Sequence, residues 1–199
     1  MKKKQKKERF TLMVILLIPV AIAINIVGGQ MTSILKLPID LDMIGVLLVG
    51  MVAGPIPAAV TGVLTNLING IMDPSWIPYA FTSFFIGIGS GLLAKAKMTN
   101  RVWKNVISGI IVALIGTITA TPITVFFFGG ATGGGASMIA AGLMATGKQI
   151  LESVFSVYIV TELVGKLISI FVAYIILKAL PARSLIKFPY GMNYVQIKE

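Results

Sequence analysis

The sequence predicts an all-α, polytopic membrane protein with six transmembrane helices and both termini in the cytoplasm. Its 199 residues are 56% hydrophobic and only 12% charged, whereas a soluble domain is about 25% charged. Four apolar runs contain no ionisable residue. A helix needs about 20 residues to cross a bilayer, and each run is at least that long. These runs lie between Arg9 and Lys36, Asp42 and Asp73, Asp73 and Lys95, and Lys104 and Lys148. A last apolar stretch, 153–177, contains Glu162 and Lys166.

Basic clusters set the predicted orientation and the number of spans. Six basic residues and one acid occupy 1–9, four bases occupy 95–104, and four more follow Leu177. The positive-inside rule places all three clusters in the cytoplasm, which requires an even number of spans. The run 43–72 is therefore divided at Gly54-Pro55 into two spans, since prolines remove backbone donors and end helices.

The spans are expected, in order, at 10–28, 42–54, 56–72, 78–95, 103–128 and 152–178. The second is only about 19 Å long at 1.5 Å per residue, so neighbouring helices should cover its outer end. The glycine-rich segment 129–150 contains too few consecutive apolar residues to cross the membrane. We expect it to form an outer lid with a short helix. A single domain should occupy 1–181, followed by a cytoplasmic tail, 182–199.

Composition excludes several kinds of site. The chain has no Cys and no His, which excludes a disulfide framework, a Cys/His zinc site, a Ser-His or Cys-His nucleophile pair and His-bound haem. We expect no metal or cofactor. Gly142 to Lys148 matches the first seven positions of a phosphate-binding P-loop, but Gln149 stands where Ser or Thr should hold magnesium. The net charge of +10 lies mainly at the cytoplasmic ends, where it attracts anionic lipid and not nucleic acid.

Polar residues inside the spans converge on the outer half of the membrane. Because each is costly in lipid, each must face protein or a wet cavity. Asn66, Asn69 and Asp73 share one helix face, and Tyr158, Glu162 and Lys166 share another. Asn25, Gln30, Asp40, Asp42, Trp76 and Tyr79 lie at span ends near the same depth. Together they predict a small-molecule pocket.

Structural alternatives exist for the same residues. Glu162 and Lys166 could be a self-satisfied pair within one helix. Trp76 and Tyr79 could belong to an interfacial aromatic belt, and Asn66 and Asn69 could only join helices.

The run LPIDLDMIGVLLVGMVAGPIPAAVTGVLTNLINGIMDPSWIPYAF, the later FFFGGATGGG and a sixth helix with a central Lys resemble the S component of energy-coupling factor (ECF) transporters. The resemblance extends from the first span to about Pro181. It implies a non-enzymatic, multi-pass subunit of a bacterial plasma membrane that captures a vitamin or vitamin precursor outside the cell. A transmembrane T component and two ABC-type ATPase subunits would be its partners.

The resemblance also implies a binding site built from the outer loops and the outer ends of later helices, where Trp76, Tyr79, the segment Gly129–Gly135, Glu162 and Lys166 fall. Together with the polar residues of the spans, the candidate binding residues are Gln30, Asp42, Asn66, Asn69, Trp76, Tyr79, Thr132, Glu162 and Lys166. Many members carry an Ala-x-x-x-Ala docking face on the first helix. Here Ala21 is followed four residues later by Asn25, and Ala23 is the other small residue nearby.

The aromatic residues favour a flat heteroaromatic substrate, pyridoxine-like or hydroxymethylpyrimidine-like, over pantothenate, which has no ring. Two other functions are open from the residues alone. A self-sufficient secondary transporter or channel is disfavoured because the sequence shows no inverted repeat. An intramembrane enzyme using Glu162 and Lys166 as acid and base lacks a paired catalytic signature.

Overall fold

The computed structural model describes residues 10–195, which form helices and connecting turns with no strand in that range. The predicted cytoplasmic segment 1–9 and Lys198 lie outside the described residues. The helices are α1 (Leu12–Ile34), α2 (Ile44–Ala53), α3 (Pro55–Met72), the 3₁₀ turn η1 (Pro74–Trp76), α4 (Ala80–Lys95), α5 (Val102–Phe128), α6 (Gly135–Ala145), α7 (Ile150–Ala179), α8 (Ala182–Leu185) and α9 (Met192–Val195). The all-α class is confirmed.

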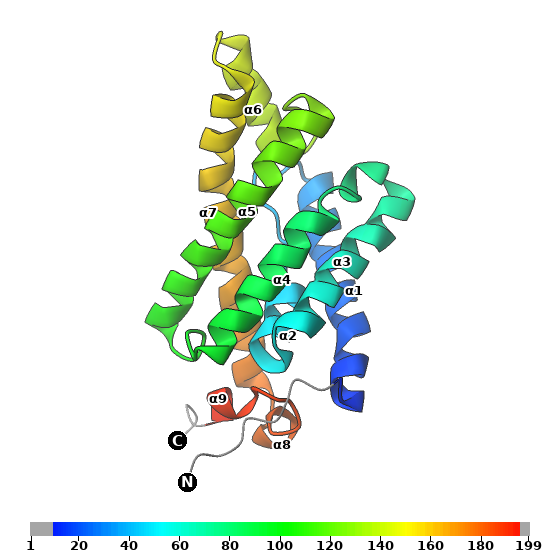
Figure 1. Cartoon of the computed structure of the whole chain (residues 1–199), viewed down its shortest axis with the longest axis vertical. Coiled ribbons are helices and arrows are strands. Elements are labelled where there is room, and N and C mark those ends of the chain that lie inside the picture. The colour runs from blue at the N-terminus through cyan, green and yellow to red at the C-terminus, as the bar shows by residue number, and fades with distance from the viewer. Residues whose placement is uncertain (1–9, 196–199) are drawn as a thin grey trace.

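Successive long helices alternate in direction along the molecule (Figure 1). Helices α1, α3 and α5 run toward the end that carries α6, here called the α6 end, and α2, α4 and α7 run back toward the α9 end. Within the described residues, α1, α3, α5 and α7 are long and apolar enough to cross a membrane, while α2, α4 and α6 are shorter apolar helices. This alternation is what the six-span prediction requires; the number of crossings itself stays a prediction.

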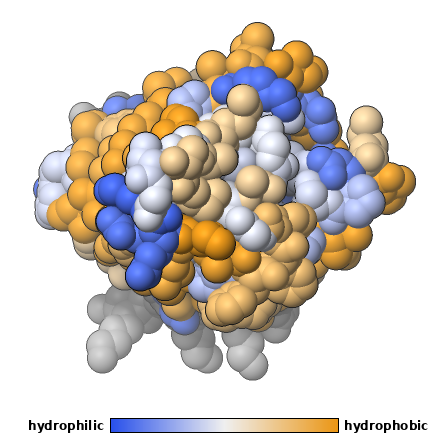
Figure 2. Space-filling view, turned by 90° about the horizontal axis from the view of Figure 1, so that it is seen from above, coloured by the Kyte–Doolittle hydropathy of each residue, from blue (hydrophilic) through white to orange (hydrophobic). Residues whose placement is uncertain are grey.

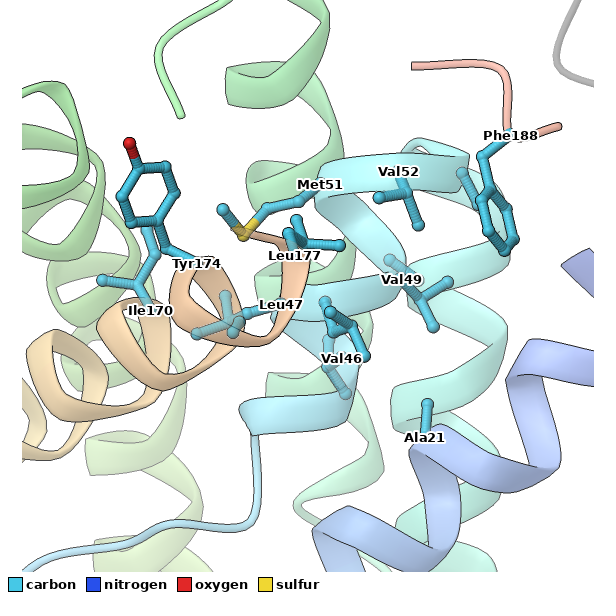
Figure 3. Close-up of a cluster of buried hydrophobic side chains, with 14 of the residues drawn as sticks. Ala21, Val46, Leu47, Val49, Met51, Val52, Ile170, Tyr174, Leu177 and Phe188 are labelled. Atoms are coloured by element: carbon cyan, nitrogen blue, oxygen red, sulfur yellow. The ribbon is translucent and has the colours of Figure 1, made fainter. Parts of the chain in front are cut away.

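Helix α2 is short and wholly enclosed, as its length predicted. All ten of its residues are buried. The chain reverses at Gly54, whose φ of 98° suits glycine, and Pro55 begins α3 where a missing N–H costs nothing. Figure 3 shows α2 side chains packed against Ile170, Tyr174 and Leu177 of α7 and against Ala21 of α1. We call this cluster the α2 core.

Close helix contacts at the α2 core depend on missing side chains. A Cβ on Gly45 of α2 would collide with the backbone of Ala21, and one on Gly91 of α4 would collide with the backbone of Pro55. Small residues allow such approach where no hydrophobic effect between helices assists packing. Gly45 and Gly91 therefore set how closely α1 approaches α2 and how closely α4 approaches the start of α3.

The segment after α7 closes the α9 end. Leu185, Phe188 and Tyr194 are buried members of the α2 core. The Tyr190 N–H donates to the Val52 carbonyl at 3.0 Å, and the Tyr194 and Thr99 hydroxyls lie 2.6 Å apart. Residues 182–195 thus pack on the helices, and the cytoplasmic position predicted for 182–199 stays a prediction.

Candidate ligand-binding site

A cavity of about 270 Å³ lies toward the α6 end, close to the lower limit of ordinary small-molecule pockets. Figure 2 views the molecule from that end, where hydrophilic and hydrophobic side chains are intermixed. The cavity is lined by α1, the loop 35–43, α3, the α3–α4 connection, α4, α5, the segment 132–137 and α7. Its polar and aromatic lining residues include Thr32, Ser33, Lys36, Asp40, Asp42, Asn66, Asp73, Ser75, Trp76, Tyr79, Thr82, Ser83, Thr132, Ser137, Tyr158, Glu162 and Lys166.

Helix α7 contributes an ion pair to the cavity wall. Lys166 Nζ lies 3.1 Å from Glu162 Oε2, and the two side chains are 2% and 9% exposed. Gly116 of α5 makes room for the carboxylate, because a Cβ there would collide with it. The intrahelical pair that the i, i+4 spacing suggested is present, and both members also line the cavity.

The loop 35–43 brings two aspartates beside this pair. Gly165 of α7 lets the backbone of Asp40 approach to 2.8 Å from where a Cβ would be. Asp42 is only 7% exposed, and its Oδ1 has no hydrogen-bond partner. Asp40 itself is exposed. The pKa of its carboxyl is raised to about 7, first because neighbouring protein displaces part of the bulk water and then because the Asp42 charge is close, while the Lys166 charge opposes the rise.

Three aromatic residues form another wall. The Tyr79 hydroxyl lies 2.6 Å from Thr124 Oγ1, which lies 3.0 Å from the Tyr158 hydroxyl. The Tyr79 ring is parallel to that of Phe128, with 5.9 Å between centroids. Trp76 is fitted against Gly29, where a Cβ would meet the indole at 3.1 Å. These contacts fix the rings before any ligand arrives.

Buried polar atoms with unused capacity lie between the charged and aromatic walls. The Asn66 amide donates to Ser83 Oγ at 2.5 Å and to the Gly62 carbonyl at 3.1 Å, while its Oδ1 has no partner. Thr82 Oγ1 is also buried without a partner. Such groups are costly unless a ligand or water satisfies them.

Residues 132–137 of the segment 129–150 cover one side of the cavity, and α6 is the short helix expected in this segment. Gly135 packs against the backbone of Leu37, and Lys36 Nζ donates to the Gly133 carbonyl at 3.3 Å. Ser137 Oγ accepts the Thr132 N–H at 3.1 Å, which holds Thr132 at the cavity. The cover is therefore tied directly to the loop 35–43.

The structure brings most of the predicted binding residues together. Asp42, Asn66, Trp76, Tyr79, Thr132, Glu162 and Lys166 line the cavity. Gln30 and Asn69 are not among the lining residues: Gln30 is half-buried on α1 and Asn69 is buried on α3.

Several lining residues are absent from the list of candidate binding residues. Tyr158 and Asp40 had a sequence signal, since both belong to the polar residues that predicted the pocket. Thr32, Thr82 and Ser137 are ordinary helix residues in sequence and had none.

Of the three predicted docking residues, two are buried and one is exposed. Ala21 is fully buried under Gly45. Asn25 is also buried: its Oδ1 accepts the Gly45 N–H at 2.6 Å and its amide donates to Thr65 Oγ1 at 3.0 Å. Both residues hold α1 against α2 and α3, so the surface position that docking needs is found only for Ala23, which is exposed.

Comparison with known proteins identifies the family. The family model described as ECF transporter, substrate-specific component, matches residues 13–177, from the start of α1 to near the end of α7. No curated protein and no solved structure matches. With its apolar helices, this match makes the chain a multi-pass protein of the cell membrane. The chain belongs to the family of substrate-specific (S) components of ECF transporters.

Proposed function

We propose that the cavity binds a small, flat heteroaromatic vitamin or vitamin precursor, pyridoxine-like or hydroxymethylpyrimidine-like. The observation that carries the proposal is the composition of the cavity. Trp76, Tyr79 and Tyr158 offer rings for stacking, and Asn66 and Asp42 offer unpartnered acceptors for edge contacts. A volume of about 270 Å³ suits a single small ring system with short substituents.

In this proposal the chain captures its ligand at the outer face, at the α6 end. It then delivers the ligand through a transmembrane T component and two ATPase subunits. The chain's own P-loop-like run does not resemble a phosphate cradle: Gly142 lies inside helix α6, and Lys148 pairs with Glu152 at 3.4 Å on the surface. ATP hydrolysis is therefore assigned to the partner subunits.

Docking is proposed on the exposed face of α1. Ala23 lies there between Val20 and Val27, which are 55% and 59% exposed. A large side chain at Ala23 should impair uptake by the assembled transporter and spare ligand binding, because close helix approach needs small residues.

A thermal-shift screen of the purified chain against B vitamins and their precursors tests the proposed ligand class. Pyridoxine-type or aminopyrimidine compounds should raise the melting temperature, since a ligand that binds only the folded state stabilises it. Pantothenate should have no effect. The proposal fails if no flat ring compound binds, or if pantothenate alone does.

A further inference from the structure

Charged residues line the cavity unequally: Asp40, Asp42, Asp73 and Glu162 against Lys36 and Lys166. Most of these charged side chains already interact with other groups of the protein. Glu162 and Lys166 neutralise each other. Asp73 Oδ1 accepts the Ser75 N–H at 3.0 Å and caps η1. Lys36 is exposed and bonds to the Gly133 carbonyl.

Within residues 10–195, Asp40 and Asp42 have no ion-pair partner of their own, because Lys166, whose charge acts on both, is already paired with Glu162. Neither forms an ion pair within 4.0 Å in the part of the chain that the structure describes, residues 10–195. Asp42 is 7% exposed and carries an unpartnered oxygen. A buried carboxylate in this state is costly, and a cation beside it recovers much of that cost.

We propose that the ligand is an organic cation, a heteroaromatic ring bearing a protonated amine or a quaternary nitrogen, whose charge is bound by Asp40 and Asp42. The inference rests on the proposed function and specifies the charge of its substrate class. The aromatic wall of Trp76, Tyr79 and Tyr158 supports an organic cation, since ring faces attract such charges. Within residues 10–195 no group of three or more acidic, His or Cys side chains could hold a metal ion, so the acids suit an organic charge better than a metal.

The loop aspartates also give the site a pH dependence. The pKa of Asp40 is about 7, so a fraction of the chain carries a proton there at neutral pH. Asp42 on the same loop, Glu162 and Lys166 on α7, Asp73 beside η1 and Lys36 at the rim are the other charged groups facing this cavity. As the pH falls below about 7, Asp40 becomes neutral and affinity for a cation should fall. A neutral ligand should not show this fall.

Two matched pairs of ring compounds test the inference by calorimetry on the purified full chain. Pyridoxamine is compared with pyridoxine, and 4-amino-5-aminomethyl-2-methylpyrimidine with its 5-hydroxymethyl counterpart. Within each pair the ring is the same and an ammonium replaces a hydroxyl. The ammonium member of at least one pair should bind tenfold or more tightly at pH 8, and the preference should shrink at pH 5.5.

The outcomes separate this inference from the proposed function. Equal or tighter binding of the hydroxyl members would overturn the cation inference and leave the proposed ring-binding function standing. Failure of all four compounds to bind would contradict both.

Isosteric variants locate the charge recognition. Asp42→Asn and Asp40→Asn should each reduce the ammonium preference toward one, because the amide removes the negative charge and keeps an acceptor oxygen. Glu152→Gln is the matched control, because this exposed carboxylate pairs with Lys148 on the surface and does not line the cavity, and it should keep the preference. An undiminished preference in both loop variants would overturn the assignment. The pH dependence of the parent chain tests the same point if a variant does not fold.

Discussion

One face of α7 serves two regions of different chemistry. Residues Tyr158, Glu162 and Lys166 recur every four positions along the cavity, and Ile170 and Tyr174 continue the same spacing into the α2 core. The change from polar to apolar occurs within a single turn, between Lys166 and Ile170. The cavity lies just beyond the N-terminal end of α2, because Asp42 and Met43 line it and α2 begins at Ile44. A half-length helix thus separates a packed, apolar region from a region with unused polar groups.

The largest expected effect concerns which side of the membrane each end faces. The chain contains no Cys, so single cysteines can be introduced without background. Ala131→Cys lies exposed near the α6 end and Lys97→Cys lies exposed in the turn before α5. In intact cells a membrane-impermeant maleimide should label the first and not the second. Labelling of Lys97→Cys alone would invert the assignment of the cavity to the outer face.

The next prediction tests whether the Glu162–Lys166 ion pair stabilises the fold, binds ligand or does both. Lys166→Met alone should lower the free energy of unfolding by about 3–5 kcal/mol, since it leaves the Glu162 carboxylate buried without its partner. The double change Glu162→Gln with Lys166→Met should recover most of that stability. If the pair contacts ligand, the double variant should still lose about 1–3 kcal/mol of binding free energy.

Denaturant unfolding in detergent and calorimetry would measure the two quantities. Parental affinity in the double variant would return both residues to a purely structural role.

A third change tests the α2 core. Leu47 is fully buried, and Leu47→Ala should cost about 2–5 kcal/mol of stability because it leaves a cavity among tightly packed helices. Leu16→Ala on the exposed face of α1 is the control and should cost much less. Ligand affinity of folded Leu47→Ala protein should stay near the parental value. A large loss of affinity would show that the two regions are not separable.

The smallest effect is expected for Asp40→Asn, because Asp40 is exposed and solvent screens its charge. The pKa of Asp40 is raised from 3.8 to about 7 in the folded chain, so its ionised form opposes folding increasingly as the pH rises above about 4, and fully above pH 7. Asparagine resembles the protonated form. The variant should melt at a slightly higher temperature than the parent at pH 8, and the difference should vanish as the pH falls toward 4. A lower melting temperature of the variant at pH 8 would contradict the destabilising effect of ionised Asp40.

Much of the fold could be predicted because its signals are local in sequence. Charge-free runs located the long helices, and Gly54-Pro55 located the division between α2 and α3. The i, i+4 spacing of Glu162 and Lys166 predicted their pairing. The short helix in 129–150 followed from an apolar stretch too brief to span.

The features that could not be predicted depend on the rotation of each helix about its own axis, which decides which side chains face the neighbouring helices. Nothing local in sequence shows that Ala21 and Asn25 face α2 and that Ala23 faces outward, because α1 is apolar on every side. The same holds for Asn69, which is buried beside the cavity residue Asn66 without lining the cavity. The path of the loop 35–43 across Gly165 is a tertiary contact, and it is what places Asp40 in the site.

The central claim, that this cavity binds a flat ring ligand, can be tested directly with the chain's two tryptophans. Trp76 lines the cavity, and Trp103 is 56% exposed at the start of α5, toward the α9 end. In Trp103→Phe the remaining fluorescence reports on the cavity, and in Trp76→Phe it reports on a distant surface. Titration with pyridoxamine or the aminomethylpyrimidine should change Trp76 emission saturably and leave Trp103 emission unaltered. A saturable change confined to Trp103, or bound ligand with no change at Trp76, would contradict the claim.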